Sequence, residues 1–272
     1  MSNKTALCIG INNYPGTQND LNGCVNDAND WAKELESRGF TVTLLLDAKA
    51  KKANIIKEMK KMLNATKEDD SVVIQYSGHG SYVPDENGDE ADGKDECMCP
   101  HDIAKKNGEN NFITDDELFD IYSLRHHKSR LVIISDSCHS GTNSRAAILL
   151  SPTKQPRKSR FLSPANFLSA KEMAKFGSSN GFQKASKPGR YAGLLMAGCQ
   201  DSQVSYDAYF QDRPNGAFSF AALKALKELG KSPSATYNDW FKGIKKILPS
   251  QDYDQIPNLY GASTMKKWKV LA

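Results

Sequence analysis

The sequence lacks a long hydrophobic run. A helix that crosses a bilayer needs about 20 consecutive apolar residues, and no apolar run in this 272-residue chain comes near that length. The first residues, MSNKTALCIGINNY, hold too short an apolar stretch for a secretory signal and are more typical of a first strand. We therefore expect a cytoplasmic protein that does not contact a membrane.

A disulfide framework and a nucleotide-binding loop are also missing. The 6 cysteines are spread widely along a chain without an export signal, which favours reduced thiols. Neither GxGxxG nor GxxxxGK[ST] occurs, and this disfavours an enzyme that uses a nucleotide. No internal repeat is visible, so a solenoid or propeller is not indicated.

The charge of the chain is unevenly distributed. The formal net charge is +4, yet residues 143–190 hold 10 Lys or Arg and a single acid, whereas acids outnumber bases elsewhere. Such a basic segment could bind nucleic acid, but it shows no stripe of positive charge along a helix. We therefore favour a tether and expect no nucleic-acid partner.

Strand-like and helix-like segments alternate along the rest of the chain. Buried strands are expected at 5–11, 41–46, 71–76, 130–135, 191–197 and 268–271, and helices at 24–36, 54–63, 115–124, 218–229 and 237–248. With 39% apolar residues, this length suits one sizeable domain. Strand–helix alternation predicts an α/β fold with a mostly parallel twisted sheet covered by helices on both faces.

Residues 143–190 interrupt this alternation. They are rich in Ser, Lys, Arg and Pro and have no sustained period, so we expect a linker that is partly disordered, with a short helix around 167–176. The linker divides the domain into a first part, 1–142, and a second part, 191–272.

A cysteine follows one of the predicted strands. Arg130 to Gly141 reads RLVIISDSCHSG, in which a run of aliphatic residues gives way to small and polar ones around Cys138. Open α/β sheets place their ligand sites at the carboxyl ends of strands. A thiol at such an edge is a candidate nucleophile, and it needs a base to form the thiolate.

A histidine follows another predicted strand in the same way. Asp70 to Gly80 reads DSVVIQYSGHG, with His79 between two glycines. If the two strands are parallel neighbours, His79 and Cys138 emerge on one edge, and the Gly80 N–H can point at a developing oxyanion. Either residue alone would more often be structural, but the pair favours nucleophilic catalysis.

These two motifs resemble those of a known family. YSGHG at Tyr76–Gly80 and DSCHSG at Asp136–Gly141 are similar to the histidine and cysteine motifs of metacaspases, the caspase-like cysteine peptidases. The resemblance covers about 5–142 and 190–262. It implies a three-layer caspase-like fold, a monomeric bare catalytic domain of the bacterial or protist type, and cleavage by a His79–Cys138 dyad. The N–H groups of Gly80 and Cys138 would hold the oxyanion.

Two carboxylates flank this predicted site. Asp136 could cap a turn, or it could receive a basic substrate side chain at the edge of the sheet. Asp27 would lie at the start of a helix on the same side, where the helix dipole also favours an acid. The resemblance implies that Cys24, Asp27, Ser77 and Asp136 line the pocket for the residue before the cut bond. Paired acids there would prefer Arg or Lys and reject acidic side chains.

An acidic loop raises the question of calcium. Residues 85–96, DENGDEADGKDE, contain seven acids, which is typical of a solvated loop but also suits Ca²⁺. The resemblance implies ligands at Asp95, Asp115 and Asp116, and a further acid where this chain has Arg145. Arginine cannot ligate a cation, so we regard calcium as one of two alternatives and expect no required cofactor.

The basic linker is a candidate for self-cleavage. A peptidase that cuts after Arg or Lys could process its own chain there, and the candidates are Lys154, Arg157, Lys158, Arg160 and Arg190. The alternative to an enzyme is a catalytically silent caspase-fold interaction module. We expect protein or peptide substrates with Arg or Lys before the cut bond.

Overall fold

A six-stranded sheet forms the centre of the computed structural model, which describes residues 2–88, 90, 92–104, 110–138, 157–177, 192–200, 203–210 and 212–272. The strand order is β12-β9-β7-β3-β1-β2. Neighbouring strands are parallel except for β12, which runs antiparallel to β9. The strands are β1 (Lys4–Gly10), β2 (Thr41–Leu46), β3 (Ser71–Ser77), β7 (Arg130–Asp136), β9 (Leu194–Ala197) and β12 (Asn258–Tyr260).

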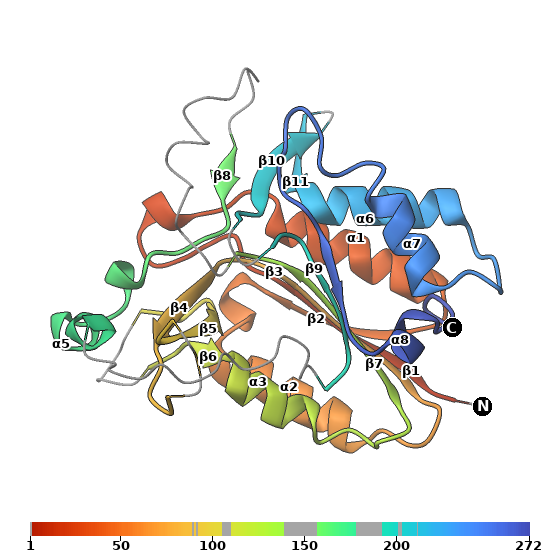
Figure 1. Ribbon diagram of the computed structural model, residues 1–272, viewed down its shortest axis with the longest axis horizontal. Helices are drawn as coiled ribbons and strands as arrows, with labels where there is room; N and C mark the ends of the chain where they lie inside the picture. The colour runs from red at the N-terminus through yellow and green to blue at the C-terminus, as the bar shows by residue number, and fades with distance from the viewer. Residues whose placement is uncertain are drawn as a thin grey trace.

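Helices cover both faces of this sheet, as Figure 1 shows. One face carries α1 (Cys24–Ser37), α6 (Ala217–Leu229) and α7 (Tyr237–Ile244). The other carries α2 (Lys52–Asn64) and α3 (Asp115–Tyr122), which begins with a capping box of Thr114 and Glu117. The predicted α/β fold of three layers is confirmed.

The burial of the strands explains why they read as continuous apolar runs. In β1, Ala6 and Cys8 join the core under α1, whereas Leu7 and Ile9 join the core over α2. Successive side chains of a strand point to opposite faces, and here both faces are covered. The apolar sequence therefore has no polar alternation.

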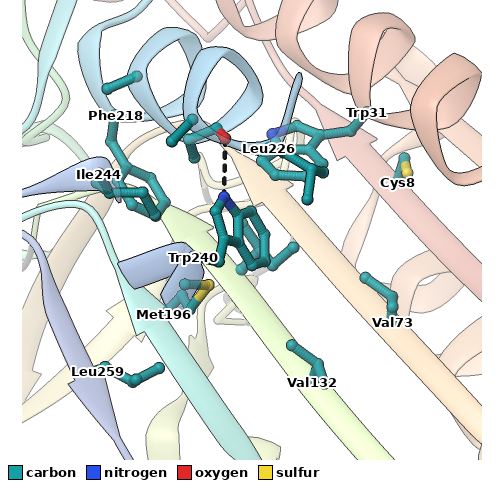
Figure 2. Close-up of a cluster of buried hydrophobic side chains, with 14 of the residues drawn as sticks. Cys8, Trp31, Val73, Val132, Met196, Phe218, Leu226, Trp240, Ile244 and Leu259 are labelled. Carbon is teal, nitrogen blue, oxygen red and sulfur yellow. Dashed lines mark hydrogen bonds between the residues drawn. The ribbon is translucent and has the colours of Figure 1, made fainter. Parts of the chain in front are cut away.

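Trp240 of α7 fills the space between α6 and the sheet (Figure 2). Its indole Nε1–H donates to the carbonyl of Ala222 over 2.9 Å, so the one polar atom of the buried ring is satisfied. The Trp31 ring meets it edge-on, with centroids 5.9 Å apart. This packing fixes α1, α6 and α7 on the sheet.

Two small sheets lie beside the carboxyl end of the central one (Figure 1). One has the order β4-β5-β6, with β4 (Gly80–Pro84), β5 (Lys94–Met98) and β6 (Ile113–Thr114). The other has the order β11-β10-β8, with β8 (Lys158–Ser159), β10 (Tyr206–Phe210) and β11 (Arg213–Gly216). Short 3₁₀ turns are η1 (Thr17–Asn19), η2 (Asp47–Lys49), η3 (Pro164–Asn166) and η4 (Ala174–Gly177).

The prediction of a last strand at 268–271 is wrong. The edge of the sheet beside β9 is taken by β12. Residues after α8 (Ser263–Lys266) instead form backbone hydrogen bonds around the start of α7. Tyr237 N–H donates to the Trp268 carbonyl, and Val270 N–H donates to the Ala235 carbonyl. Lys269 forms only an isolated antiparallel bridge with Thr236, and the apolar side chains of Trp268, Val270 and Leu271 join or pack against the core on the α1 side of the sheet.

Residues 157–177 of the predicted linker are folded onto the domain. Pro164, Leu162, Phe167 and Leu168 are buried, and α5 (Ala170–Met173) lies within the range expected for a short helix. The rest of the predicted linker, with Arg145, Lys154 and Arg190, lies outside the described residues. No described helix has the length and apolarity that a bilayer crossing requires.

Candidate active site

The histidine and cysteine motifs follow two neighbouring parallel strands. In the β3–β7 pair, Ser77 lies opposite Asp136, and each motif continues past that point at the same edge of the sheet. His79 is 4% exposed and Cys138 is 0% exposed. The structure thus brings both residues to one edge, under a cover of other segments.

His79 is oriented by a backbone carbonyl. Its Nε2 lies 2.7 Å from the carbonyl oxygen of Asn19, which can only accept, so Nε2 carries the proton. Nδ1 is therefore the basic nitrogen, and it is buried without a hydrogen bond to the described residues. The Tyr14 ring packs against the imidazole at a centroid distance of 4.6 Å. Burial lowers the pKa of His79 to about 4, so the imidazole is neutral.

The two predicted oxyanion donors meet at a single oxygen atom. Gly80 N–H donates to the carbonyl of Arg160 over 3.0 Å, and Cys138 N–H donates to the same carbonyl over 3.3 Å. Convergent N–H groups of this kind are what a developing oxyanion requires. A peptide carbonyl of the chain itself occupies the position predicted for the scissile carbonyl.

The Cys138 thiol lies beside the backbone of Ser205. The thiol donates to the Ser205 carbonyl over 3.3 Å, and the Ser205 N–H points at Sγ. The same Ser205 carbonyl accepts the Arg160 N–H over 2.9 Å. The Ser205 carbonyl therefore accepts hydrogen bonds from both the Cys138 thiol and the N–H of Arg160, whose own carbonyl faces the oxyanion donors.

The guanidinium of Arg160 is completely buried among three carboxylates. Nη2 lies 2.7 Å from Asp27 and 3.1 Å from Asp207, and Nη1 lies 3.1 Å from Asp136. Nη1 also donates to the backbone carbonyl of Asp136 over 3.1 Å. The pocket predicted from Asp27 and Asp136 thus holds an arginine side chain.

The carboxylates of this pocket are fixed by donors from other elements. These donors are Asn215 Nδ2–H and Gly216 N–H to Asp27, Ser219 N–H and the Ser205 hydroxyl to Asp136, and Asn22 N–H and Gly23 N–H to Asp207. Burial raises the pKa of Asp27 to about 6, although the Arg160 charge opposes this. Without the arginine, the pocket would hold an uncompensated negative charge.

Cys24 and Ser77 are buried near this pocket, but neither is among the groups that accept a hydrogen bond from Arg160. Cys24 begins α1, and burial raises the pKa of its thiol well above normal while the Arg160 charge lowers it. The Ser77 hydroxyl accepts from Gln75 Nε2 over 2.8 Å. Their contribution to binding stays a prediction.

Asp207 and Gly216 are pocket residues that the sequence did not reveal. Asp207 lies in β10, where nothing in YDAYF marks it as a ligand. A Cβ at Gly216 would meet the Asp136 carboxylate and would lie 2.5 Å from Arg160 Nη1. Its φ of −71° suits any residue, so glycine is needed there for space.

Two of the three predicted calcium ligands, Asp115 and Asp116, begin α3, whereas the third, Asp95, lies in β5. Burial, followed by the charges of Glu96 and Asp116, raises the pKa of Asp115 to about 6, and its Oδ1 is buried without a hydrogen bond to the described residues. Glu96, not Asp95, is the acid of β5 whose charge acts most strongly on Asp115. In the part of the chain that the structure describes, no three His, Cys, Asp or Glu side chains form a group that could hold an ion.

Comparisons with known proteins agree with the fold. The sequence model of the caspase domain family matches residues 3–268 of this chain. Metacaspase-1 of Cryptococcus neoformans is 33% identical over 96% of this chain and 63% of its own length. Metacaspase-1A of Aspergillus terreus is 32% identical over 94% of this chain and 70% of its own. A crystal structure of a Geobacter sulfurreducens protein superposes with a TM-score of 0.73 at 28% identity, covering 99% of this chain and 98% of that one. The chain thus spans less than two thirds of the Cryptococcus relative.

Filling the space at Gly216 should expel Arg160 from the pocket. In a Cys138→Ala chain, Gly216→Ala is expected to speed trypsin cleavage after Arg160 at least tenfold, because a buried bond must first be exposed. Mass spectrometry of the fragments measures this. Gly243→Ala, whose new Cβ would meet Ala225 on α6, is the matched control and should leave the rate unchanged. Equal rates in the two variants would contradict the pocket assignment.

The pKa of His79 should make the folded state sensitive to acid. Because the folded pKa of about 4 lies below the ordinary 6.5, the unfolded chain binds the extra proton first. Stability is then lost as pH falls from about 6.5 to 4, by up to about 3 kcal/mol. Comparing urea unfolding of Cys138→Ala with that of Cys138→Ala/His79→Gln isolates this loss, since Asp27 titrates in both. Parallel pH curves would show that His79 is not desolvated.

Proposed function

Since this chain belongs to the caspase domain family and resembles the metacaspases within it, we propose that it is a cysteine endopeptidase that cleaves peptide bonds after Arg or Lys. The observation that carries the proposal is the placement of Arg160. Its side chain lies in the acidic pocket while its carbonyl faces the N–H groups of Gly80 and Cys138. A substrate residue before the cut bond would be held in the same two ways.

The proposed reaction uses Cys138 and His79 in two stages. Cys138 transfers its thiol proton to Nδ1 of His79, and the sulfur bonds to the scissile carbonyl carbon while Gly80 and Cys138 N–H stabilise the oxyanion. His79 then gives the proton to the leaving amine as the C–N bond breaks. In the second stage, His79 takes a proton from water, the hydroxide displaces the sulfur, and the proton returns to Cys138. The Asn19 carbonyl engages Nε2–H, which leaves Nδ1 as the nitrogen that can take the thiol proton.

The charge and shape of the pocket support a basic residue before the cut bond. Two separate nitrogens of the Arg160 guanidinium reach three carboxylates. Lysine offers a single ammonium group, so we propose that arginine is preferred over lysine. An acidic side chain would add a like charge to the buried cluster and is expected to be excluded.

Among the five self-cleavage candidates, Arg160 has the strongest support. Arg157 lies over the Tyr206 ring, with its guanidinium carbon 4.8 Å from the ring centroid. Lys158 donates to the Asp20 carbonyl over 2.6 Å. Lys154 and Arg190 lie outside the described residues. We therefore propose that the chain cuts itself between Arg160 and Phe161.

The silent interaction module remains the competing function, and one observation favours it. Cys138 is fully buried, and the segment around Arg160 covers the site. In that interpretation the Arg160 cluster is a permanent structural element. The two functions differ in whether the Arg160–Phe161 bond is ever broken.

Self-cleavage is expected at Arg160 and should depend on the charge of its side chain. Freshly synthesised chain should yield a fragment that begins at Phe161, detected by mass spectrometry. Arg160→Gln should slow its formation at least a hundredfold, and Arg160→Lys much less, because glutamine brings no charge to the carboxylates. Cys138→Ala should give no fragment, and Arg190→Gln tests an alternative bond. Identical intact masses for wild-type and Cys138→Ala chains would favour the silent module.

We propose calcium binding near Asp115 as a separate property. Because the described side chains form no ready-made group for an ion, a divalent cation would have to draw the carboxylates together, and it would relieve the repulsion from Glu96 and Asp116 that adds to burial in raising the pKa of Asp115. Millimolar Ca²⁺ is expected to raise the unfolding temperature of the Cys138→Ala chain by a few degrees, and Asp115→Asn should remove most of that rise. An Asp120→Asn variant on the same helix serves as the control. An unfolding temperature that is the same with calcium and with EDTA would contradict this proposal.

A further inference from the structure

The segment around Arg160 crosses from one small sheet to the other at the proposed cleavage bond. Before the bond, β8 pairs antiparallel with β10, so that Ser159 lies opposite Tyr206. After the bond, Phe161 forms a parallel bridge with Gly80, the first residue of β4. A peptide in this position is bound as an added strand on both sides of the bond.

Phe161, the residue after the bond, stacks on an aromatic ring of β4. Its ring and that of Tyr82 have centroids 5.7 Å apart and planes inclined by 29°. Tyr82 is itself held by the Lys94 ammonium, 4.7 Å from the ring centroid, and by the edge contact of Phe176 at 5.5 Å. The Tyr82 ring is thus fixed as a flat surface beside the bond.

Leu162, the next residue, is bound through its backbone and buried through its side chain. Its N–H donates to the Gly80 carbonyl over 3.0 Å, and its own carbonyl accepts from the Ser81 hydroxyl over 2.6 Å. The Leu162 side chain is 2% exposed and belongs to the apolar core on the α2 side of the sheet. A polar side chain at this position would lose its hydration without gaining a partner.

We propose that β4 is a recognition strand for the residues that follow the cut bond. Tyr82 selects an aromatic side chain at the first position, and Gly80 with Ser81 fixes the second, which is a buried aliphatic residue. The substrate class is therefore an extended peptide that carries Arg, then an aromatic residue, then Leu or a similar side chain. This inference rests on the proposed peptidase function and adds specificity on the far side of the bond.

The expected effect follows from the two contacts. An offset aromatic pair stabilises a contact beyond the effect of its buried area, and loss of the buried ring surface adds to the cost of removing it. Replacing Phe161 with alanine should therefore slow cleavage about tenfold. Replacing Tyr82 with alanine should have a similar effect, because the same contact is lost from the other partner.

A double-mutant cycle in the full chain tests the Tyr82–Phe161 contact. The rate at which the fragment beginning at residue 161 appears is measured after cell-free synthesis. Tyr82→Ala and Phe161→Ala should each slow it about tenfold, and the double variant should be no slower than either single one, since the contact can be lost only once. Tyr82→Phe and Phe161→Tyr keep the ring and should stay within about twofold of the wild type. Phe119→Ala, an exposed aromatic on α3, controls for unspecific effects. Additive losses or unchanged rates would overturn the proposal.

Peptides added to the wild-type protein separate this proposal from the proposed function. The three probes are a fluorogenic Lys-Ser-Arg amide without residues after the bond, and quenched peptides with Lys-Ser-Arg-Phe-Leu-Ser and Lys-Ser-Arg-Ala-Leu-Ser. The Phe peptide should be cut with a kcat/KM about tenfold above that of the Ala peptide, and Tyr82→Ala should bring this ratio close to one. If the amide is cut and the two peptides are cut at the same rate, the proposed role of β4 is disproved while the peptidase function stands. If none of the three is cut, the peptidase function fails.

Discussion

The buried ion cluster around Arg160 is the interaction on which the site depends. Asp27 comes from α1, Asp136 from the end of β7 and Asp207 from β10, and their carboxylates meet at one guanidinium with no exposure to solvent. Burying charges costs several kcal/mol per ion, and removing one partner of such a cluster leaves the others uncompensated. Three acids face one base here, so the Arg160 guanidinium compensates part of the negative charge that the fold buries at this point.

Hydrophobic periodicity was sufficient to predict the fold class. The aliphatic runs of β1, β3 and β7 and the helical spacing of α1 and α6 each agree with burial on the faces that the structure shows. The last strand could not be placed in this way, because Trp268 and Val270 pack against the core on the α1 side, while the segment forms only an isolated bridge through Lys269 and does not join the central sheet. Composition indicated a partly disordered linker with one short helix, but it could not indicate the order of residues 157–177, which depends on long-range contacts such as the hydrogen bond from Ser81 to Leu162.

The candidate site was predictable only where side-chain chemistry lies next to a strand end. His79, Cys138 and Asp136 follow buried strands, and that position drew attention to them. The Asn19 carbonyl and the Ser205 backbone act through main-chain atoms, which every residue possesses and which leave no mark in a sequence. Asp207 reaches the pocket only because β10 pairs with β8, a contact across 47 residues or more. The catalytic roles of these residues remain predictions that the proposed experiments test.

The tethering of Arg160 has a kinetic consequence. A segment joined to the site by its own chain is present there at an effective concentration of about millimolar or more, whatever the amount of protein. In the proposed reaction its cleavage is unimolecular, so dilution would not slow it. A free peptide, by contrast, must displace a ligand that never diffuses away. The first turnover of each molecule would thus be reserved for its own chain, and foreign substrates would gain access only afterwards.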